Sequence, residues 1–129
     1  MFKLILGIKN NEMNQKTPLN ISPQELKKWL DDDLNHPILI DVREKEELAI
    51  ASLPRKVLHL PLSEHSDWID SYAKHLPFNQ NLVVICHSGI RSWNFATWLL
   101  EQDSRYQVWN LKGGIDAWSQ EVDTLVPRY

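Results

Sequence analysis

The sequence lacks the features that define several large classes of protein. Cys86 is the single cysteine among 129 residues, so an intramolecular disulfide framework is excluded and a reducing compartment is expected. The 14 Lys and Arg are outnumbered by 17 Asp and Glu, which leaves a net charge of −3 and no basic excess for nucleic acid or a membrane surface. We therefore expect a cytoplasmic protein that binds neither nucleic acid nor membranes.

Patterns of metal ligands are also missing. The three successive carboxylates from Asp31 to Asp33 point in different directions and lack the alternating spacing of a calcium loop. Four histidines show no convincing metal spacing with one another; they are His36, His59, His65 and His75. We expect no metal ion and no cofactor. The sequence leaves open a histidine folded back toward Cys86 as a general base.

The chain divides into a short extension and one domain. The apolar residues after Met1 are interrupted by Gly7 and Lys9 and are followed by no small-residue cleavage site, which argues against a secretory signal. We expect residues 1–17 to be an N-terminal extension that can fray, with Met13 as an alternative start of translation. No repeat is visible, and a composition of 43% hydrophobic and 24% charged residues predicts one globular domain over residues 18–129.

Apolar runs alternate with amphipathic segments along this domain. Strands are predicted at residues 19–21, 38–43, 57–62, 82–85 and 107–111. Helices are predicted at residues 23–30, 44–50, 63–74, 92–103 and 115–121, the first of them with a capping box formed by Ser22 and Glu25 around Pro23. This alternation implies an α/β, doubly wound sheet with helices on both faces, in which ligands bind at the carboxyl ends of the strands.

The aliphatic run from Leu82 to Ile85 ends at Cys86 and turns through a short loop into a helix. The loop amides and the first N–H groups of that helix have no intrahelical partners, and together with Arg91 they favour the thiolate form of Cys86. Gly89 suits a tight loop that needs a positive φ. A cysteine at the end of a buried strand is, alternatively, often a small inert core residue.

The run from Cys86 to Ser92 resembles the active-site loop of the rhodanese family, commonly Cys-Arg-x-Gly-x-Arg-Ser, with four residues between cysteine and the final arginine. Other segments resemble the same family: Asp41-Val42-Arg43 after an aliphatic strand, the pair Pro61-Leu62, and Leu111-x-Gly113-Gly114 followed by Trp118. The resemblance extends from about residue 18 to the C-terminus. It implies a single rhodanese-like domain with five mostly parallel strands.

The resemblance also implies a sulfurtransferase of the thiosulfate:cyanide type. Cys86 would carry a sulfane sulfur as a persulfide, taken from a small anionic donor such as thiosulfate, or from a persulfide-carrying protein, and passed to a thiol or cyanide. The loop would bind the substrate and stabilise the persulfide through His87, Ser88, Gly89, Ile90, Arg91 and Ser92. Asp41 and Arg43 would organise the fold beside the site.

His87 departs from the commonest family loop, which has a second arginine at this position, and it favours a persulfide-bearing donor over thiosulfate. Two other functions are alternatives. Rhodanese-like domains also serve as non-catalytic interaction modules, and a related Cys-x5-Arg loop belongs to a group of phosphatases and arsenate reductases. The x4 spacing favours a single sulfur atom over a tetrahedral oxyanion. The sequence predicts no oligomeric state.

Overall fold

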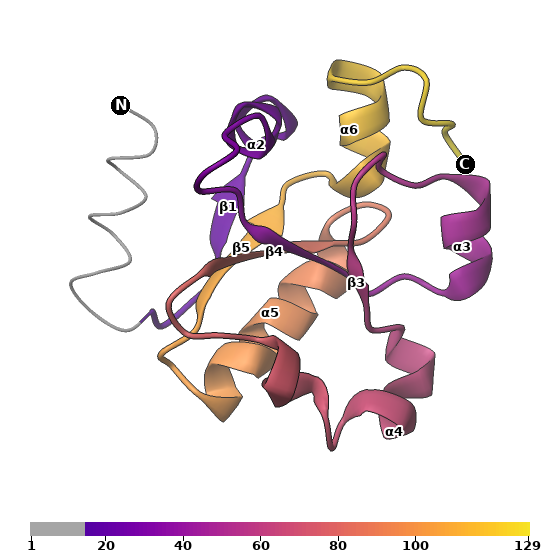
Figure 1. Ribbon diagram of the computed structural model, residues 1–129. Helices are drawn as coiled ribbons and strands as arrows, with labels where there is room; N and C mark the ends of the chain where they lie inside the picture. Colours follow the sequence, from indigo (N-terminus) through magenta and orange to yellow (C-terminus); the bar gives the residue numbers. More distant parts are fainter. Residues whose placement is uncertain (1–14) are drawn as a thin grey trace.

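A five-stranded sheet forms the centre of the structure, a computed structural model that describes residues 15–129 (Figure 1). Its strands are β1 (Leu19–Ile21), β2 (Ile38–Asp41), β3 (Leu58–His59), β4 (Asn81–Ile85) and β5 (Gln107–Leu111). The α-helices are α2 (Pro23–Leu30), α3 (Lys45–Ile50), α4 (His65–Trp68), α5 (Ile90–Gln102) and α6 (Gly114–Glu121). The expectations for the first fourteen residues, including the start at Met13, lie outside the described residues.

The strands lie in the order β1-β5-β4-β2-β3, and every neighbouring pair is parallel. In the register, Val84 of β4 lies beside Ile40 of β2 and Asn110 of β5. The predicted α/β fold with a five-stranded sheet is confirmed, and the sheet is wholly parallel rather than mostly parallel. Parallel strands bring their carboxyl ends to the same edge, so the residues that follow β2, β4 and β5 meet there.

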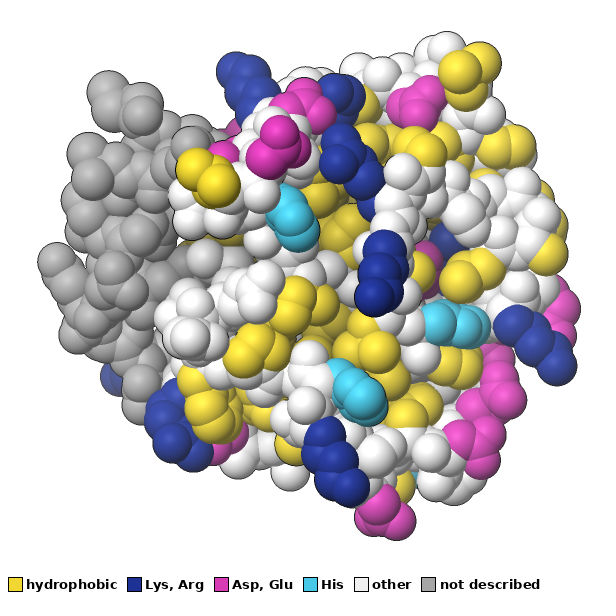
Figure 2. Space-filling model, in the orientation of Figure 1, with side chains coloured by type: hydrophobic (Ala, Val, Ile, Leu, Met, Phe, Trp, Pro, Cys, Tyr) yellow, Lys and Arg dark blue, Asp and Glu magenta, His cyan; other side chains and the backbone are white. Residues whose placement is uncertain are grey.

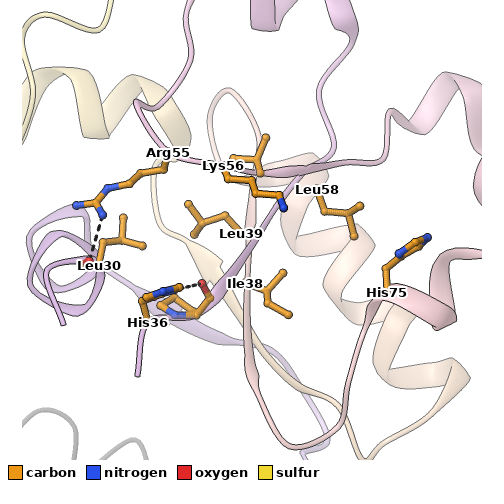
Figure 3. Close-up of a pocket in the computed structure, with 10 residues that line it drawn as sticks. Leu30, His36, Ile38, Leu39, Arg55, Lys56, Leu58 and His75 are labelled. Atoms are coloured by element: carbon orange, nitrogen blue, oxygen red, sulfur yellow. Dashed lines mark hydrogen bonds between the residues drawn. The ribbon is translucent and has the colours of Figure 1, made fainter. Parts of the chain in front are cut away.

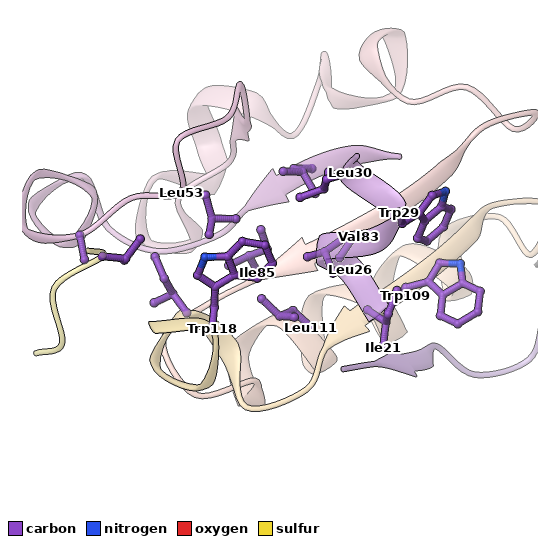
Figure 4. Close-up of a cluster of buried hydrophobic side chains, with 14 residues drawn as sticks. Ile21, Leu26, Trp29, Leu30, Leu53, Val83, Ile85, Trp109, Leu111 and Trp118 are labelled. Carbon is purple, nitrogen blue, oxygen red and sulfur yellow. The ribbon is translucent and has the colours of Figure 1, made fainter. Parts of the chain in front are cut away.

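Side chains alternate between the two faces of the sheet, and each face has its own hydrophobic core. On β4, Val83 and Ile85 pack with α2 and α6, as Figure 4 shows. Leu82 and Val84 of the same strand, and Cys86 directly after it, pack with α5 and α4 on the other face. Figure 1 shows these helices on opposite sides of the sheet. The predicted covering of both faces is therefore confirmed, and Cys86 belongs to the face that α5 covers.

The start of α2 follows the predicted capping box. The side chain of Ser22 accepts a hydrogen bond from the backbone N–H of Glu25 at 3.1 Å, and the Glu25 carboxylate accepts one from the N–H of Ser22 at 3.2 Å. Pro23 occupies the first helical position, where its missing N–H costs no hydrogen bond. The helix then buries Leu26 and Trp29 against the sheet.

The segment between β3 and β4 differs from the prediction. The strand expected at residues 57–62 is only Leu58–His59, because Pro61 has no N–H with which to continue the ladder. The single helix expected at residues 63–74 is wrong. The chain forms two 3₁₀ turns, η1 (Leu62–Glu64) and η2 (Tyr72–His75), with α4 between them. Serine and aspartate are frequent here and disfavour a continuous helix by hydrogen-bonding to the nearby backbone.

The first described residue, Gln15, pairs with the sheet through its side chain. Its amide accepts a hydrogen bond from the N–H of Val108 at 2.9 Å and donates one to the carbonyl of Val108 at 3.0 Å. The amide thus acts as a neighbouring strand would, just ahead of β1. Within residues 15–129, no helix combines the length and the apolar character needed to cross a membrane.

Candidate active site

Cys86 follows the last residue of β4 and precedes the loop that leads into α5. Its side chain is fully buried, with 0% of its surface exposed, and its neighbours include apolar residues on the α5 side of the sheet. Burial alone is compatible with an inert core cysteine. What distinguishes this thiol is the set of polar groups that reach its sulfur.

Two hydrogen-bond donors lie against the sulfur of Cys86. The backbone N–H of Gly89 donates to Sγ at 3.1 Å, and the hydroxyl oxygen of Ser92 lies 3.2 Å from Sγ. Both residues are buried. An N–H and an O–H directed at a buried sulfur favour its negatively charged form, because each donates to the anion.

Ser92 connects the thiol to Asn110 at the end of β5. Its hydroxyl lies 2.5 Å from the side-chain oxygen of Asn110, and the side-chain nitrogen of Asn110 donates to the carbonyl of Gly89 at 3.2 Å. One hydroxyl carries one proton, so Ser92 cannot donate to both neighbours at the same time. A neutral Cys86 can donate to Ser92 while Ser92 donates to Asn110, and a thiolate can instead accept from Ser92. The buried network therefore accommodates both protonation states.

The N-terminus of α6 holds the carbonyl groups at the start of the loop. The N–H of Ile115 donates to the carbonyl of Cys86 at 2.9 Å, and the N–H of Asp116 donates to that of His87 at 3.1 Å. With these carbonyls drawn toward α6, the next part of the loop turns back so that Gly89 presents its N–H to the sulfur. Gly89 has a φ of +97°, as its predicted role in a tight loop requires.

Arg91 lies in the first turn of α5, and its guanidinium is paired with a carboxylate from another element. Two of its nitrogens donate to the two oxygens of Glu47 on α3, at 2.7 and 2.8 Å. The hydrogen bonds from Arg91 lower the pKa of Glu47 to about 2. The positive charge of Arg91, which the sequence predicts to act on the loop, is thus balanced by Glu47, a residue without a predicted role at the site.

A second ion pair, which is buried, lies beside this partly exposed one. Arg43 has 0% of its surface exposed and donates to both carboxylate oxygens of Asp41, the shortest contact being 2.8 Å. Its remaining nitrogen donates to the hydroxyl of Tyr129 at 2.9 Å, and that hydroxyl donates to Glu47 at 2.7 Å. Asp41 and Arg43 therefore connect the end of β2 to α3 and to the C-terminal segment.

The outer part of the loop is covered by the C-terminal segment. The ring of Tyr129 stacks on His87, with centroids 4.1 Å apart and an angle of 13° between the planes. Ser88 and Ile90, the two other predicted binding residues, are exposed, and Ile90 retains 68% of its surface. Burial raises the pKa of Tyr129 to about 12, so its hydroxyl stays protonated near neutral pH and can donate to Glu47.

Comparison with known proteins identifies the family of the chain. The model of the rhodanese-like domain matches residues 22–121. The chain belongs to the rhodanese-like domain family. It is 36% identical over 121 residues to the rhodanese-like/PpiC domain-containing protein 12, chloroplastic, of Arabidopsis thaliana, covering 91% of this chain and 40% of that protein. It is 35% identical over 102 residues to the putative sulfurtransferase YtwF of Bacillus subtilis, covering 79% of this chain and 91% of that protein.

A larger relative and a solved structure complete the comparison. The adenylyltransferase and sulfurtransferase UBA4 of Debaryomyces hansenii is 36% identical over 115 residues, which cover 86% of this chain but 26% of that protein. The rhodanese-like chain thus spans less than half of two of these relatives. The crystal structure of a rhodanese-like domain protein from Staphylococcus aureus superposes with a TM-score of 0.66 at 24% identity, covering 86% of this chain and 98% of that one. That likeness supports the fold.

Two cavities lie at different places on this rhodanese-like domain. One of about 360 Å³ adjoins the loop, with Ser88, Gly89 and Ile90 in its wall opposite Lys112. Another of about 500 Å³ lies near the amino ends of β2 and β3, lined by Ile38 and Leu58 among others, and contains no residue of the Cys86 loop (Figure 3). Figure 2 shows apolar side chains exposed in this second hollow, with basic and histidine side chains around it.

The structure brings together all the loop residues predicted from the sequence, but three partners were missed. Glu47, Asn110 and Tyr129 contact Arg91, Ser92 and His87 across 44, 18 and 42 positions of the chain. An asparagine inside the apolar run of residues 108–111 was a signal for Asn110. In the described part of the chain, no histidine hydrogen-bonds to the Cys86 sulfur, and no cluster of three metal-ligating side chains is present.

Proposed function

We propose that this rhodanese-like domain transfers a sulfane sulfur through a persulfide on Cys86. The observation that carries the proposal is the pair of donors on the sulfur, one from Gly89 and one from Ser92. They favour a thiolate, which is the nucleophilic form. The family and the sulfurtransferase names of its relatives support the same reaction class.

The reaction consists of two displacements at sulfur. With thiosulfate as donor, the Cys86 thiolate bonds to the outer sulfur, the sulfur–sulfur bond of thiosulfate breaks, and sulfite leaves with the electron pair. Cys86 then carries a persulfide anion. An acceptor thiolate or cyanide attacks the terminal sulfur, receives it, and releases the Cys86 thiolate. Atoms and charges balance in each step, and neither step needs a metal or a redox cofactor.

The loop supplies the environment for the persulfide. The amides from His87 to Ser92 lie around the end of β4, and the N-terminus of α5 adds a positive electrostatic field. Arg91 holds this loop against α3 through Glu47. Because Cys86 has 0% exposed surface, a donor reaches the sulfur only after a covering group is displaced. We propose that this group is the loop itself, whose outer residue His87 is stacked on Tyr129.

The partners follow from the same chemistry. A persulfide-bearing thiol or protein is the proposed donor and a thiol or cyanide the acceptor, with thiosulfate as a usable laboratory donor. The relative YrkF of Bacillus subtilis is named a putative sulfur carrier protein, which supports exchange with a protein partner. A thiol that must stay reduced between turnovers is consistent with a reducing compartment such as the cytoplasm.

Intact-mass measurement after thiosulfate treatment tests the proposal. The parent chain should gain one sulfur atom, a thiol reductant should remove it, and Cys86→Ser should gain none. The same variant should release no thiocyanate from thiosulfate and cyanide. A circular dichroism spectrum equal to that of the parent would show that the serine variant is folded. Sulfur release by folded Cys86→Ser, or no adduct on the parent with thiosulfate or an alkyl persulfide, contradicts the proposal.

The complete burial of Cys86 supports a second candidate, a rhodanese-like interaction module without turnover. In that case, the Cys86 thiol of the folded protein would stay unmodified even after many hours with a persulfide donor. The mass experiment therefore separates the two functions. A Cys86-dependent hydrolysis of aryl phosphates would instead favour the phosphatase alternative.

A further inference from the structure

Three arginines around the Cys86 loop are each paired with a carboxylate. Arg91 is paired with Glu47, Arg43 with Asp41, and Arg128 with Asp116, each through a contact of 2.7 to 2.8 Å. Each arginine that lies near the loop is thus matched by a carboxylate. A site that must attract a doubly charged donor such as thiosulfate would instead be expected to present unpaired positive charge.

Glu47 is fixed in place by hydrogen bonds from three other residues. Arg91 donates to both of its oxygens, the hydroxyl of Tyr129 donates at 2.7 Å, and the N–H of Glu44 donates at 3.1 Å. A free anion that approaches Arg91 would have to displace a carboxylate held by all of these groups. The side chain of Glu47 has 18% of its surface exposed, so solvent screens the pair only in part.

Arg91 lies in the first turn of α5 next to Ser92, whose hydroxyl oxygen is 3.2 Å from the Cys86 sulfur, so its charge lies near the reacting atom. The hydrogen bond from Arg91 to Glu47 is the main cause of a raised pKa of Arg91, and the charge of Cys86 contributes in the same direction. The guanidinium of Arg91 thus interacts with both groups, and its interaction with Glu47 is the stronger one. On the other side of the loop, Lys112 faces the cavity beside Ser88 and has no carboxylate partner within residues 15–129.

From these contacts we infer that Glu47 determines donor specificity by neutralising Arg91, so that the loop accepts sulfur from singly charged persulfides in preference to dianionic donors. Lys112 supplies one positive charge at the cavity, which matches one negative charge on the donor. The inference rests on the proposed persulfide chemistry at Cys86 and adds the residue that sets the preference between donors. Glu47 acts through Arg91 and is a positioning residue.

The test compares two donors on matched variants. Sulfur loading of Cys86 is followed by intact mass with thiosulfate and with the persulfide of 2-mercaptoethanol, which carries a single negative charge. Glu47→Gln releases the charge of Arg91, and we expect the ratio of second-order rate constants, thiosulfate over alkyl persulfide, to rise about tenfold. Glu46→Gln removes the same charge from an exposed position of α3 and should change the ratio by less than about twofold.

A double variant provides a second test, which does not depend on whether the Glu47→Gln variant folds. Glu47→Gln with Arg91→Gln removes both charges and keeps two side chains that can hydrogen-bond to each other. Because Arg91 contributes little while it is neutralised, the double variant should have the donor ratio of the parent within about twofold. A ratio well below that of the parent would mean that Arg91 already binds the dianion, and it would overturn the inference.

The remaining outcomes are distinct. If the parent loads sulfur but Glu47→Gln leaves the ratio unchanged or shifts it as Glu46→Gln does, the specificity role is refuted while the proposed function stands. If the parent loads sulfur from neither donor, the persulfide chemistry fails and the inference fails with it.

Discussion

Replacing Gly114 with alanine should push the start of α6 away from the Cys86 loop. Gly114 has a φ of +64°, and a Cβ there would lie 2.3 Å from the carbonyl oxygen of His87 and 2.5 Å from that of Cys86. Both oxygens belong to backbone held by the amides of α6, so they cannot rotate aside. The left-handed backbone costs about 1–2 kcal/mol and the overlap about 1–3 kcal/mol, which gives about 3 kcal/mol in total.

Gly113→Ala is the matched control, because Gly113 also has a positive φ, +77°, but its Cβ would meet Ala117 of α6 itself at 2.6 Å. Both variants should be less stable than the parent. For a chain of this size, each kcal/mol of lost stability lowers the melting temperature by about 4 °C. Only Gly114→Ala should displace the carbonyls of Cys86 and His87. We therefore expect a melting temperature about 12 °C lower for Gly114→Ala, together with slower sulfur loading.

Thermal unfolding followed by circular dichroism and the amide resonances of residues 86 and 87 report these two effects separately. The reasoning is refuted if Gly114→Ala melts within about 4 °C of the parent. It is also refuted if Gly113→Ala moves the two loop resonances as far as Gly114→Ala does, because the control contacts no loop carbonyl.

Two further changes act on buried polar groups. Ser92→Ala leaves the side-chain oxygen of Asn110 without the hydroxyl that lies 2.5 Å away, so unfolding in urea should show a loss of about 1–3 kcal/mol; an effect no larger than that of the exposed Ser66→Ala would contradict this. Glu47 has its pKa lowered to about 2 from an ordinary 4.5, so the stabilisation is complete above pH 4.5 and is lost as the pH falls toward 2. Since 37% of the Arg91 side chain is exposed, we expect this ion pair to contribute about 1–2 kcal/mol to the free energy of unfolding. The contribution is measured as the difference between the parent and Glu47→Gln in urea unfolding at pH 7, 5 and 3. An equal pH dependence of the two proteins would exclude such a contribution.

The sequence was sufficient for the features that local patterns encode. Aliphatic runs located the strands, and the capping box of Ser22 and Glu25 located the start of α2. The position of Cys86 followed from the end of an apolar run and the change to helical periodicity. These signals lie within a few residues of the structure that they produce, so no knowledge of the fold was needed to read them.

The missed features depend on contacts between distant segments. Glu47 and Arg91 are 44 positions apart, and Tyr129 lies 82 positions from Glu47, so nothing in the local sequence indicates that they meet. The broken helix between β3 and β4 was missed for a different reason. The apolar spacing of Trp68, Ile69 and Tyr72 favoured one helix, whereas the nearby serines and aspartates disfavour it by hydrogen-bonding to the backbone.

The alternation of side chains along β4 fixes which layer of the protein receives the thiol. Leu82 and Val84 point the same way as Cys86, while Val83 and Ile85 point the opposite way. If one residue were deleted inside this strand while its amino end stayed in place, the sulfur would point to the opposite face of the sheet, beneath α2 and α6. It would then be out of reach of Ser92. The chemistry of this domain therefore depends on the parity of a strand length as well as on the identity of a cysteine.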